Sequence, residues 1–185
     1  MLIYIHGFNS SPASSKAQLL KARLEAKGRG ARYIAPALPH SPAQAAALLD
    51  GLAQRHPGAA VVGSSLGGYY ATYLAEKHGL RAVLLNPAVR PYELLKDHLG
   101  VQQNFHSGER YEFTARHVEE LRGLEVASVM PSRYFLIVTT GDEVLDYRSA
   151  VKRYHGCRQI VINGGDHGLS DFEHHLDAVL EFCGA

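Results

Sequence analysis

The stretch Ala59–Tyr70 reads AAVVGSSLGGYY, and it decides the fold. A short apolar run, typical of a buried strand, passes through a few small residues into the pattern of a helix. Between the two, Gly63, Ser65 and Gly67 fit the pattern G-x-S-x-G. In a strand–turn–helix setting this pattern predicts a tight, strained turn that exposes the serine hydroxyl, with glycines where side chains would collide. The helix that follows would direct backbone N–H groups and the positive end of its dipole at a developing negative charge.

Outside this stretch, short apolar runs alternate with helical patterns along the chain. Strands are predicted over 2–5, 32–38, 59–62, 82–85, 133–139 and 159–162. Two helices are predicted to begin at Ser11-Pro12 and at Ser41-Pro42. A third is predicted over 65–78, and the last over 172–183. Strands separated by helices indicate βαβ units. We therefore expect an α/β fold with a mostly parallel sheet of about six strands and helices on both faces.

One segment departs from this alternation of strands and helices. Residues 89–131 separate the fourth and fifth predicted strands and are more polar than the rest. A single crossover in a compact α/β domain does not need this length. We interpret 89–131 as a short, lid-like and helical insertion over the active site, within a single domain that spans 1–185.

Composition excludes several classes of function. The 185 residues carry 19 Lys and Arg against 18 Asp and Glu, a net charge of +1. This balance argues against a nucleic-acid partner bound through a large basic surface. No apolar run approaches the length of a transmembrane helix, and the first residues lack the basic region of a signal peptide, so we expect no membrane association and a cytoplasmic location. The two cysteines, Cys157 and Cys183, lack metal-ligand spacing, and we expect neither a metal nor a cofactor.

A serine nucleophile needs a base and a group that orients the base. His167 lies in the loop between the last predicted strand and the last helix, at the strand end where ligands meet such sheets. The loop after the fifth strand, GDEVLD, offers Asp142 and Asp146 as the acid, with Asp142 nearer the strand, whereas Glu143 is predicted to face solvent. The resulting order Ser65, Asp142, His167 is the order found in α/β-hydrolases.

Two backbone N–H groups are candidates for an oxyanion hole. One belongs to Leu66, the residue after the predicted nucleophile, and the other to Phe8, in the loop after the first strand. Gly7 would let the backbone approach closely. His6 is interpreted as a side chain that anchors this loop rather than as a catalytic group.

These motifs resemble the small YqiA-type bacterial esterases of the α/β-hydrolase superfamily. The similarity runs through YIHGFNSSP (4–12), VGSSLGGYYAT (62–72), NPAVRP (86–91), TGDEVLDY (140–147) and GGDH (164–167). It implies a minimal α/β-hydrolase fold that lacks the first two strands of the larger superfamily sheet. It also implies hydrolysis of esters without a cofactor, with Ser65 as nucleophile, Asp142 as acid and His167 as base. Asp166 departs from the asparagine expected there in relatives.

The sequence therefore predicts a serine hydrolase that acts on carboxylic esters through an acyl-enzyme, with a small-molecule ester or acyl thioester as its partner. One alternative keeps the triad but takes acyl-CoA, with Arg90, Arg110, Arg116 and Arg122 of the insertion as candidate phosphate contacts. Another, of a different class, is a non-catalytic binding protein with a hydrolase fold, which predicts an impaired triad.

Overall fold

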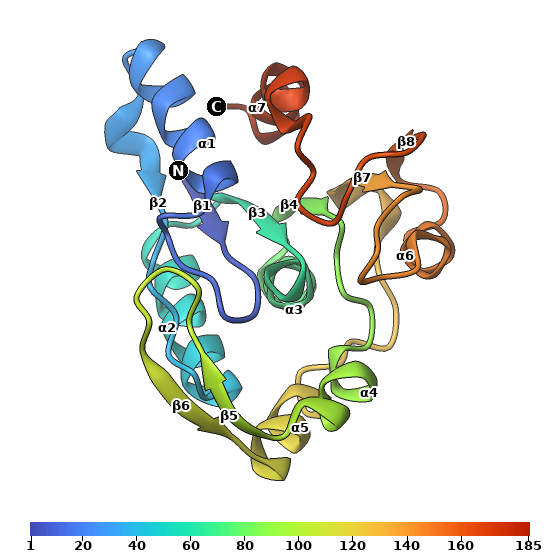
Figure 1. Ribbon diagram of the computed structural model, residues 1–185. Helices are drawn as coiled ribbons and strands as arrows, with labels where there is room; N and C mark the ends of the chain where they lie inside the picture. The colour runs from blue at the N-terminus through green and yellow to red at the C-terminus, as the bar shows by residue number, and fades with distance from the viewer.

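A six-stranded sheet forms the centre of the computed structural model, which describes all of residues 1–185 (Figure 1). The strand order is β2-β1-β3-β4-β7-β8, and every neighbouring pair is parallel. The predicted α/β class and the predicted sheet are thus confirmed. The strands are β1 (Leu2–Ile5), β2 (Tyr33–Ile34), β3 (Ala60–Ser64), β4 (Arg81–Leu85), β7 (Tyr134–Thr139) and β8 (Arg158–Ile162).

Helices cover both faces of the sheet. One face carries α1 (Ser15–Ala26) and α7 (Leu176–Cys183), and the other carries α2 (Pro42–Arg55), α3 (Leu66–His78) and α6 (Tyr147–Arg153). Successive side chains of a strand alternate between the faces, so Leu2 and Tyr4 join the core beneath α1 and α7 while Ile3 and Ile5 join the other. Since both faces are buried, the strands consist almost wholly of apolar residues rather than alternating ones.

Local signals in the sequence set several element ends. The Ser41 side chain accepts a hydrogen bond from the Gln44 N–H at 3.3 Å, and Pro42 occupies the first turn of α2. Gly79 ends α3 in the left-handed conformation, at φ 68°. Short 3₁₀ turns connect other elements at Gly30–Arg32, Lys96–His98, Pro131–Arg133 and Phe172–His175.

Two predicted boundaries were wrong, and one helix was missed. The second strand pairs over only two residues, because Pro36 and Pro39 follow and cannot donate to a ladder. Helix α1 begins at Ser15, and Pro12 lies in the turn before it. Helix α6 was not anticipated, although the Asp146 carboxylate caps it by accepting the Arg148 N–H at 3.0 Å.

The insertion is only partly helical. Its ends are the helices α4 (Pro91–Leu95) and α5 (Ala115–Arg122), but between them lies an antiparallel hairpin of β5 (Gly100–Gln103) and β6 (Arg110–Phe113). The expectation of a helical insertion was wrong there because exposure alternates with period two along both strands. The hairpin contacts the loop after β1, where the Tyr111 hydroxyl donates to Asn9 Oδ1 at 2.7 Å and the Phe105 N–H donates to the Asn9 carbonyl at 2.8 Å.

Candidate active site

Ser65 stands on a strained turn between β3 and α3. Its φ and ψ are 54° and −121°, a backbone conformation that residues other than glycine rarely adopt. A Cβ at Gly63 would lie 2.2 Å from the carbonyl oxygen of Gly67, and a Cβ at Gly67 would lie 2.0 Å from that of Ile5. The two glycines flanking the serine are therefore required by the close approach of α3 to β3 and β1.

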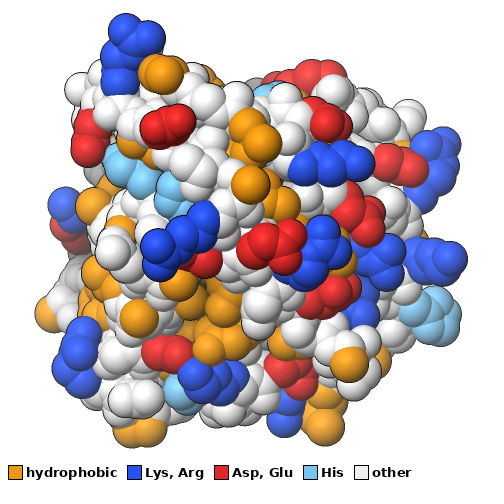
Figure 2. Space-filling model, turned by 90° about the horizontal axis from the view of Figure 1, so that it is seen from below, with side chains coloured by type: hydrophobic (Ala, Val, Ile, Leu, Met, Phe, Trp, Pro, Cys, Tyr) orange, Lys and Arg blue, Asp and Glu red, His pale blue; other side chains and the backbone are white.

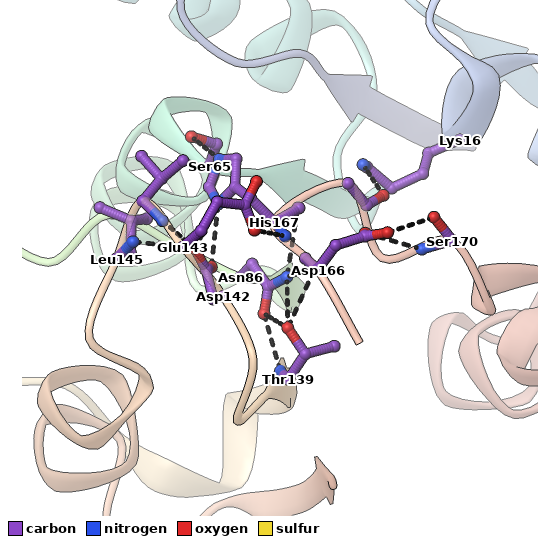
Figure 3. A network of polar contacts seen from close by, with 12 residues as sticks. Lys16, Ser65, Asn86, Thr139, Asp142, Glu143, Leu145, Asp166, His167 and Ser170 are labelled. Carbon is purple, nitrogen blue, oxygen red and sulfur yellow. Dashed lines mark hydrogen bonds and ion pairs between the residues drawn. The ribbon is translucent and has the colours of Figure 1, made fainter. Parts of the chain in front are cut away.

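The structure brings Ser65, His167 and Asp142 together from three different strand ends (Figure 3). His167 Nε2 lies 3.0 Å from Ser65 Oγ, and His167 Nδ1 lies 2.8 Å from Asp142 Oδ2. An ionised carboxylate only accepts hydrogen bonds, so Nδ1 carries the proton and donates it to Asp142. The lone pair of Nε2 is then free to accept the serine proton.

Asp142, rather than Asp146, is the carboxylate beside the histidine. The Asp142 side chain is 2% exposed, and its Oδ1 accepts the N–H groups of Val144 and Leu145 at 2.9 and 2.8 Å. Burial alone would raise the pKa of Asp142. Hydrogen bonds from His167, Leu145 and Val144 outweigh it and hold the pKa below the ordinary value of 3.8.

The two predicted oxyanion donors belong to segments that lie next to Ser65. Leu66 is the first residue of α3, so its N–H has no acceptor within the helix. The Phe8 N–H donates to no acceptor in the protein. A Cβ at Gly7 would come within 3.1 Å of the Ser65 Cβ, which shows how closely this loop passes the serine.

The His6 side chain anchors the same loop through two hydrogen bonds. It is buried, accepts the Leu38 N–H at Nε2 over 3.2 Å, and donates from Nδ1 to the Gly7 carbonyl at 3.0 Å. Burial lowers the pKa of His6, which favours the neutral ring that this bonding pattern needs.

Three side chains that hold the histidine loop escaped the sequence prediction (Figure 3). The buried Asn86 carboxamide donates to the carbonyls of Asp166 and His167 at 3.0 and 3.2 Å and accepts the Thr139 N–H at 2.9 Å. Lys16 Nζ donates to the Gly168 carbonyl at 2.5 Å. Burial lowers the pKa of Lys16 while the charges of Asp166 and Asp142 act to raise it.

The third of these side chains is Glu143. Glu143 is exposed, as predicted, and in addition its Oε2 accepts the His167 N–H at 2.9 Å. Asn86 could have been noticed in the sequence because it directly follows the β4 run. Nothing in the sequence marked Lys16 as a site residue. The structure shows that it lies on the buried side of α1 together with apolar residues.

Two hollows lie near this triad, and they are lined by residues next to it rather than by the three side chains themselves. A cleft of about 590 Å³ borders the loops after β4 and β7 together with α4 and α6. A pocket of about 40 Å³ borders Phe8 and Leu66, the residues of the two predicted oxyanion donors. Figure 2 views the molecule from below Figure 1, with hydrophobic side chains gathered in a hollow and charged side chains of both signs intermingled beside it.

No group of three or more His, Cys, Asp or Glu side chains is arranged to hold a metal ion. No helix combines the length and the apolar composition that a membrane crossing requires.

Several solved structures have a similar fold. Alpha/beta hydrolase domain-containing protein 10 from mouse matches with a TM-score of 0.69 at 14% identity, over 97% of this chain and 89% of that one. Est1E from Butyrivibrio proteoclasticus matches with a TM-score of 0.66 at 16% identity, over 97% and 83%. A protein from Agrobacterium vitis S4 matches with a TM-score of 0.75 at 18% identity, over 98% and 87%. The fold is therefore a minimal α/β-hydrolase fold.

The chain belongs to the family described as "Uncharacterised protein family (UPF0227)", which matches residues 1–184. A UPF0227 protein of Vibrio cholerae is 24% identical over 192 residues, covering the whole of both chains. The family inferred from the motifs is thereby confirmed.

Proposed function

We propose that the protein is a serine esterase that hydrolyses carboxylic esters through an acyl-enzyme. The observation that carries this proposal is the hydrogen-bonded chain from Ser65 Oγ through His167 to the buried carboxylate of Asp142. A serine hydroxyl is a weak nucleophile at neutral pH, and a neutral imidazole oriented by a carboxylate is the arrangement that activates it. The hydrolase fold and the esterases among similar structures support the same reaction class.

In the first half of the reaction, Ser65 Oγ attacks the ester carbonyl carbon as its proton passes to His167 Nε2. The N–H groups of Leu66 and Phe8 donate to the oxygen that becomes negative. Charge stabilisation of this kind contributes on the order of 100- to 1000-fold in rate per donor. The imidazolium then gives its proton to the alcohol oxygen, the carbon–oxygen bond to the alcohol breaks, and the acyl group remains on Ser65.

In the second half, a water molecule attacks the acyl carbon while His167 Nε2 takes one of its protons. The bond to Ser65 Oγ breaks, Oγ regains that proton, and the carboxylic acid leaves. Asp142 stays ionised throughout and stabilises the charged ring, as its lowered pKa requires.

The acyl-CoA alternative gains no support from the arginines of the insertion. Arg90 pairs with Glu93 and Glu125, Arg116 with Glu120, and Arg122 with Glu119. Carboxylates already pair with these three guanidinium groups, and of the four candidates only Arg110 is left without an ion pair, so an ester without phosphate groups is the simpler substrate. The non-catalytic alternative requires an impaired triad, and the geometry of this one favours catalysis.

A fluorescent fluorophosphonate probe, which reacts with activated serines, tests the proposal. We expect labelling of the wild type, loss of labelling in Ser65→Ala, and retained labelling in Ser64→Ala, the neighbouring serine of the same motif. Thermal melting of each variant checks its fold. A folded wild type that stays unlabelled, or a labelled Ser65→Ala, would overturn the proposed function.

A further inference from the structure

The two hollows beside Ser65 differ in size and in chemistry, and this difference bears on the substrate. Resting on the proposed esterase function, we infer that the substrate is a short-chain acyl ester of a hydroxylated alcohol such as a polyol or a sugar. The acyl group would occupy the small pocket and the alcohol the large cleft.

The reaction geometry assigns the hollows. The ester carbon is bound to Ser65 Oγ, and its oxyanion points at Leu66 and Phe8. The alcohol oxygen must receive a proton from His167 Nε2, so the alcohol leaves on the side of the histidine and its acid. The large cleft lies on that side, since Leu145, which donates to Asp142, forms part of its wall together with Pro87. The small pocket lies beside the oxyanion donors, where the acyl substituent remains.

The small pocket limits the acyl chain. Its volume of about 40 Å³ is more than ten times smaller than the 590 Å³ of the cleft, which favours a short acyl group such as acetyl. Part of its wall is tightly packed: Tyr70 and Phe113 are buried, and the rings of Phe8 and Phe113 meet edge to face at 5.3 Å. A chain of eight carbons would have to displace packed aromatic rings.

The large cleft suits a hydroxylated group. Only 4 of its 12 lining residues are hydrophobic, so it is a poor site for a long alkyl chain. Its volume of about 590 Å³ lies in the range of pockets that bind small molecules. Three cations and three anions line it, so it favours no net charge in its ligand. Those six residues are Arg90, Lys152, Arg153, Glu93, Glu125 and Asp146.

Some of these polar groups remain available to a ligand. Arg90 is paired with Glu93 and Glu125, and Arg153 donates to the carbonyls of the segment after α5. By contrast, Ser149 and Lys152 on α6 are exposed and make no side-chain hydrogen bond within the protein. One hydroxyl and one ammonium on the same helical face can bond to the several hydroxyls of a sugar or polyol.

The test compares kcat/KM for three esters: 6-O-acetylglucose, cyclohexylmethyl acetate and 6-O-octanoylglucose. The first two differ in the polarity of an alcohol of similar size, and the first and third differ only in acyl length. We expect 6-O-acetylglucose to exceed each of the others by about tenfold or more, as loss of several hydrogen bonds or displacement of packed rings would cause.

Two variants locate the preference. Ser149→Leu should lower the ratio of 6-O-acetylglucose to cyclohexylmethyl acetate by about fivefold, mainly through KM. Its matched control is Ser132→Leu, which should leave the ratio unchanged. Ser132 is exposed and lies just before the amino end of β7, whereas the triad lies at the carboxyl ends of the strands. Phe113→Ala should open the small pocket and raise the ratio of octanoyl to acetyl ester, and probe labelling reports whether this variant is folded.

The outcomes separate the two proposals. Hydrolysis that depends on Ser65 but prefers the octanoyl ester or the cyclohexylmethyl ester leaves the esterase function in place and overturns the assignment of the hollows. A shift with Ser149→Leu no larger than with Ser132→Leu overturns the role of the large cleft. Absence of both hydrolysis and probe labelling overturns the proposed function itself, and the substrate inference with it.

Discussion

The loops that carry the triad and the hairpin of the insertion are built in opposite ways. Around His167, three backbone carbonyls and one N–H are held by side chains of Asn86, Lys16 and Glu143. The hairpin is largely exposed, with Phe105 79% and Val101 63% exposed to solvent. It contacts the domain through hydrogen bonds to Asn9 and Ser10 in the loop after β1 and through the buried ring of Phe113.

This difference reflects the different roles of the two regions. Reacting groups need positions fixed to a fraction of an ångström, and loops at strand ends whose backbone groups are held by hydrogen bonds provide that. The insertion instead forms walls beside the site, where a wall can be rebuilt without moving the triad. Mutations in the two regions should therefore differ in kind, with loss of kcat in the first and altered selectivity in the second.

The largest effect is expected at the triad itself. Ser65→Ala or His167→Ala should each lower kcat by about 10⁴-fold or more with little change in KM, because both act only in the transition state. The double variant should be hardly worse than either single one. Steady-state kinetics on an acetyl ester measure this, and losses that simply multiply would show that the two residues do not act as a unit.

Asp142→Asn should cost almost as much, about 10³- to 10⁴-fold in kcat, because the amide neither stabilises the imidazolium nor fixes its tautomer. It should also change the response to acid. The pKa of Asp142 is lowered in the folded protein, so its ionised form stabilises the fold fully above pH 3.8, and that contribution is lost as the pH falls through the folded pKa. Melting temperatures measured from pH 6 to pH 2.5 should fall more steeply for the wild type than for Asp142→Asn, and parallel curves would contradict the shift.

Asn86→Asp should have an intermediate effect. The carboxylate would face the carbonyls of Asp166 and His167 without a proton to donate, so the histidine loop should shift. We expect kcat to fall about 10- to 100-fold with KM nearly constant, and stability to fall by about 2 kcal/mol. Glu143→Gln keeps an acceptor for the His167 N–H and is the matched control. If kcat of a folded Asn86→Asp variant equals that of the wild type, Asn86 supports only the fold.

The parts of the molecule that were predictable from sequence are those fixed by local chemistry. The strand runs, the elbow glycines and the position of His167 after the last strand each follow from what a buried parallel sheet demands. Parallel strands end at the same edge, so the loops after β3, β7 and β8 had to converge there. Asp142 was preferred to Asp146 because it lies nearer the strand end, and the structure adds that Asp146 instead caps α6.

The parts that were not predictable depend on contacts between distant segments. Lys16 resembles an ordinary surface lysine until α1 packs beside the histidine loop, 152 residues away in sequence. The hairpin of the insertion was hidden because its strands are short and polar, and an isolated hairpin is marginally stable without the domain beside it. The two hollows arise from several loops at once, so no single stretch of sequence encodes them.

The smallest effect is expected where the two regions meet. Tyr111→Phe removes the hydroxyl that donates to Asn9 Oδ1, while the stacking of the ring on His40 at 3.7 Å remains possible. Loss of one partly exposed hydrogen bond should lower the free energy of unfolding by about 0.5–1 kcal/mol. Because Asn9 follows Phe8, the loop that carries an oxyanion donor should loosen, and kcat should fall about two- to fivefold. Phe105→Ser at the exposed hairpin tip is the control and should change neither quantity. If Tyr111→Phe lowers stability but leaves kcat unchanged, the hairpin acts as a wall alone, and the loop after β1 holds its donor without help from the insertion.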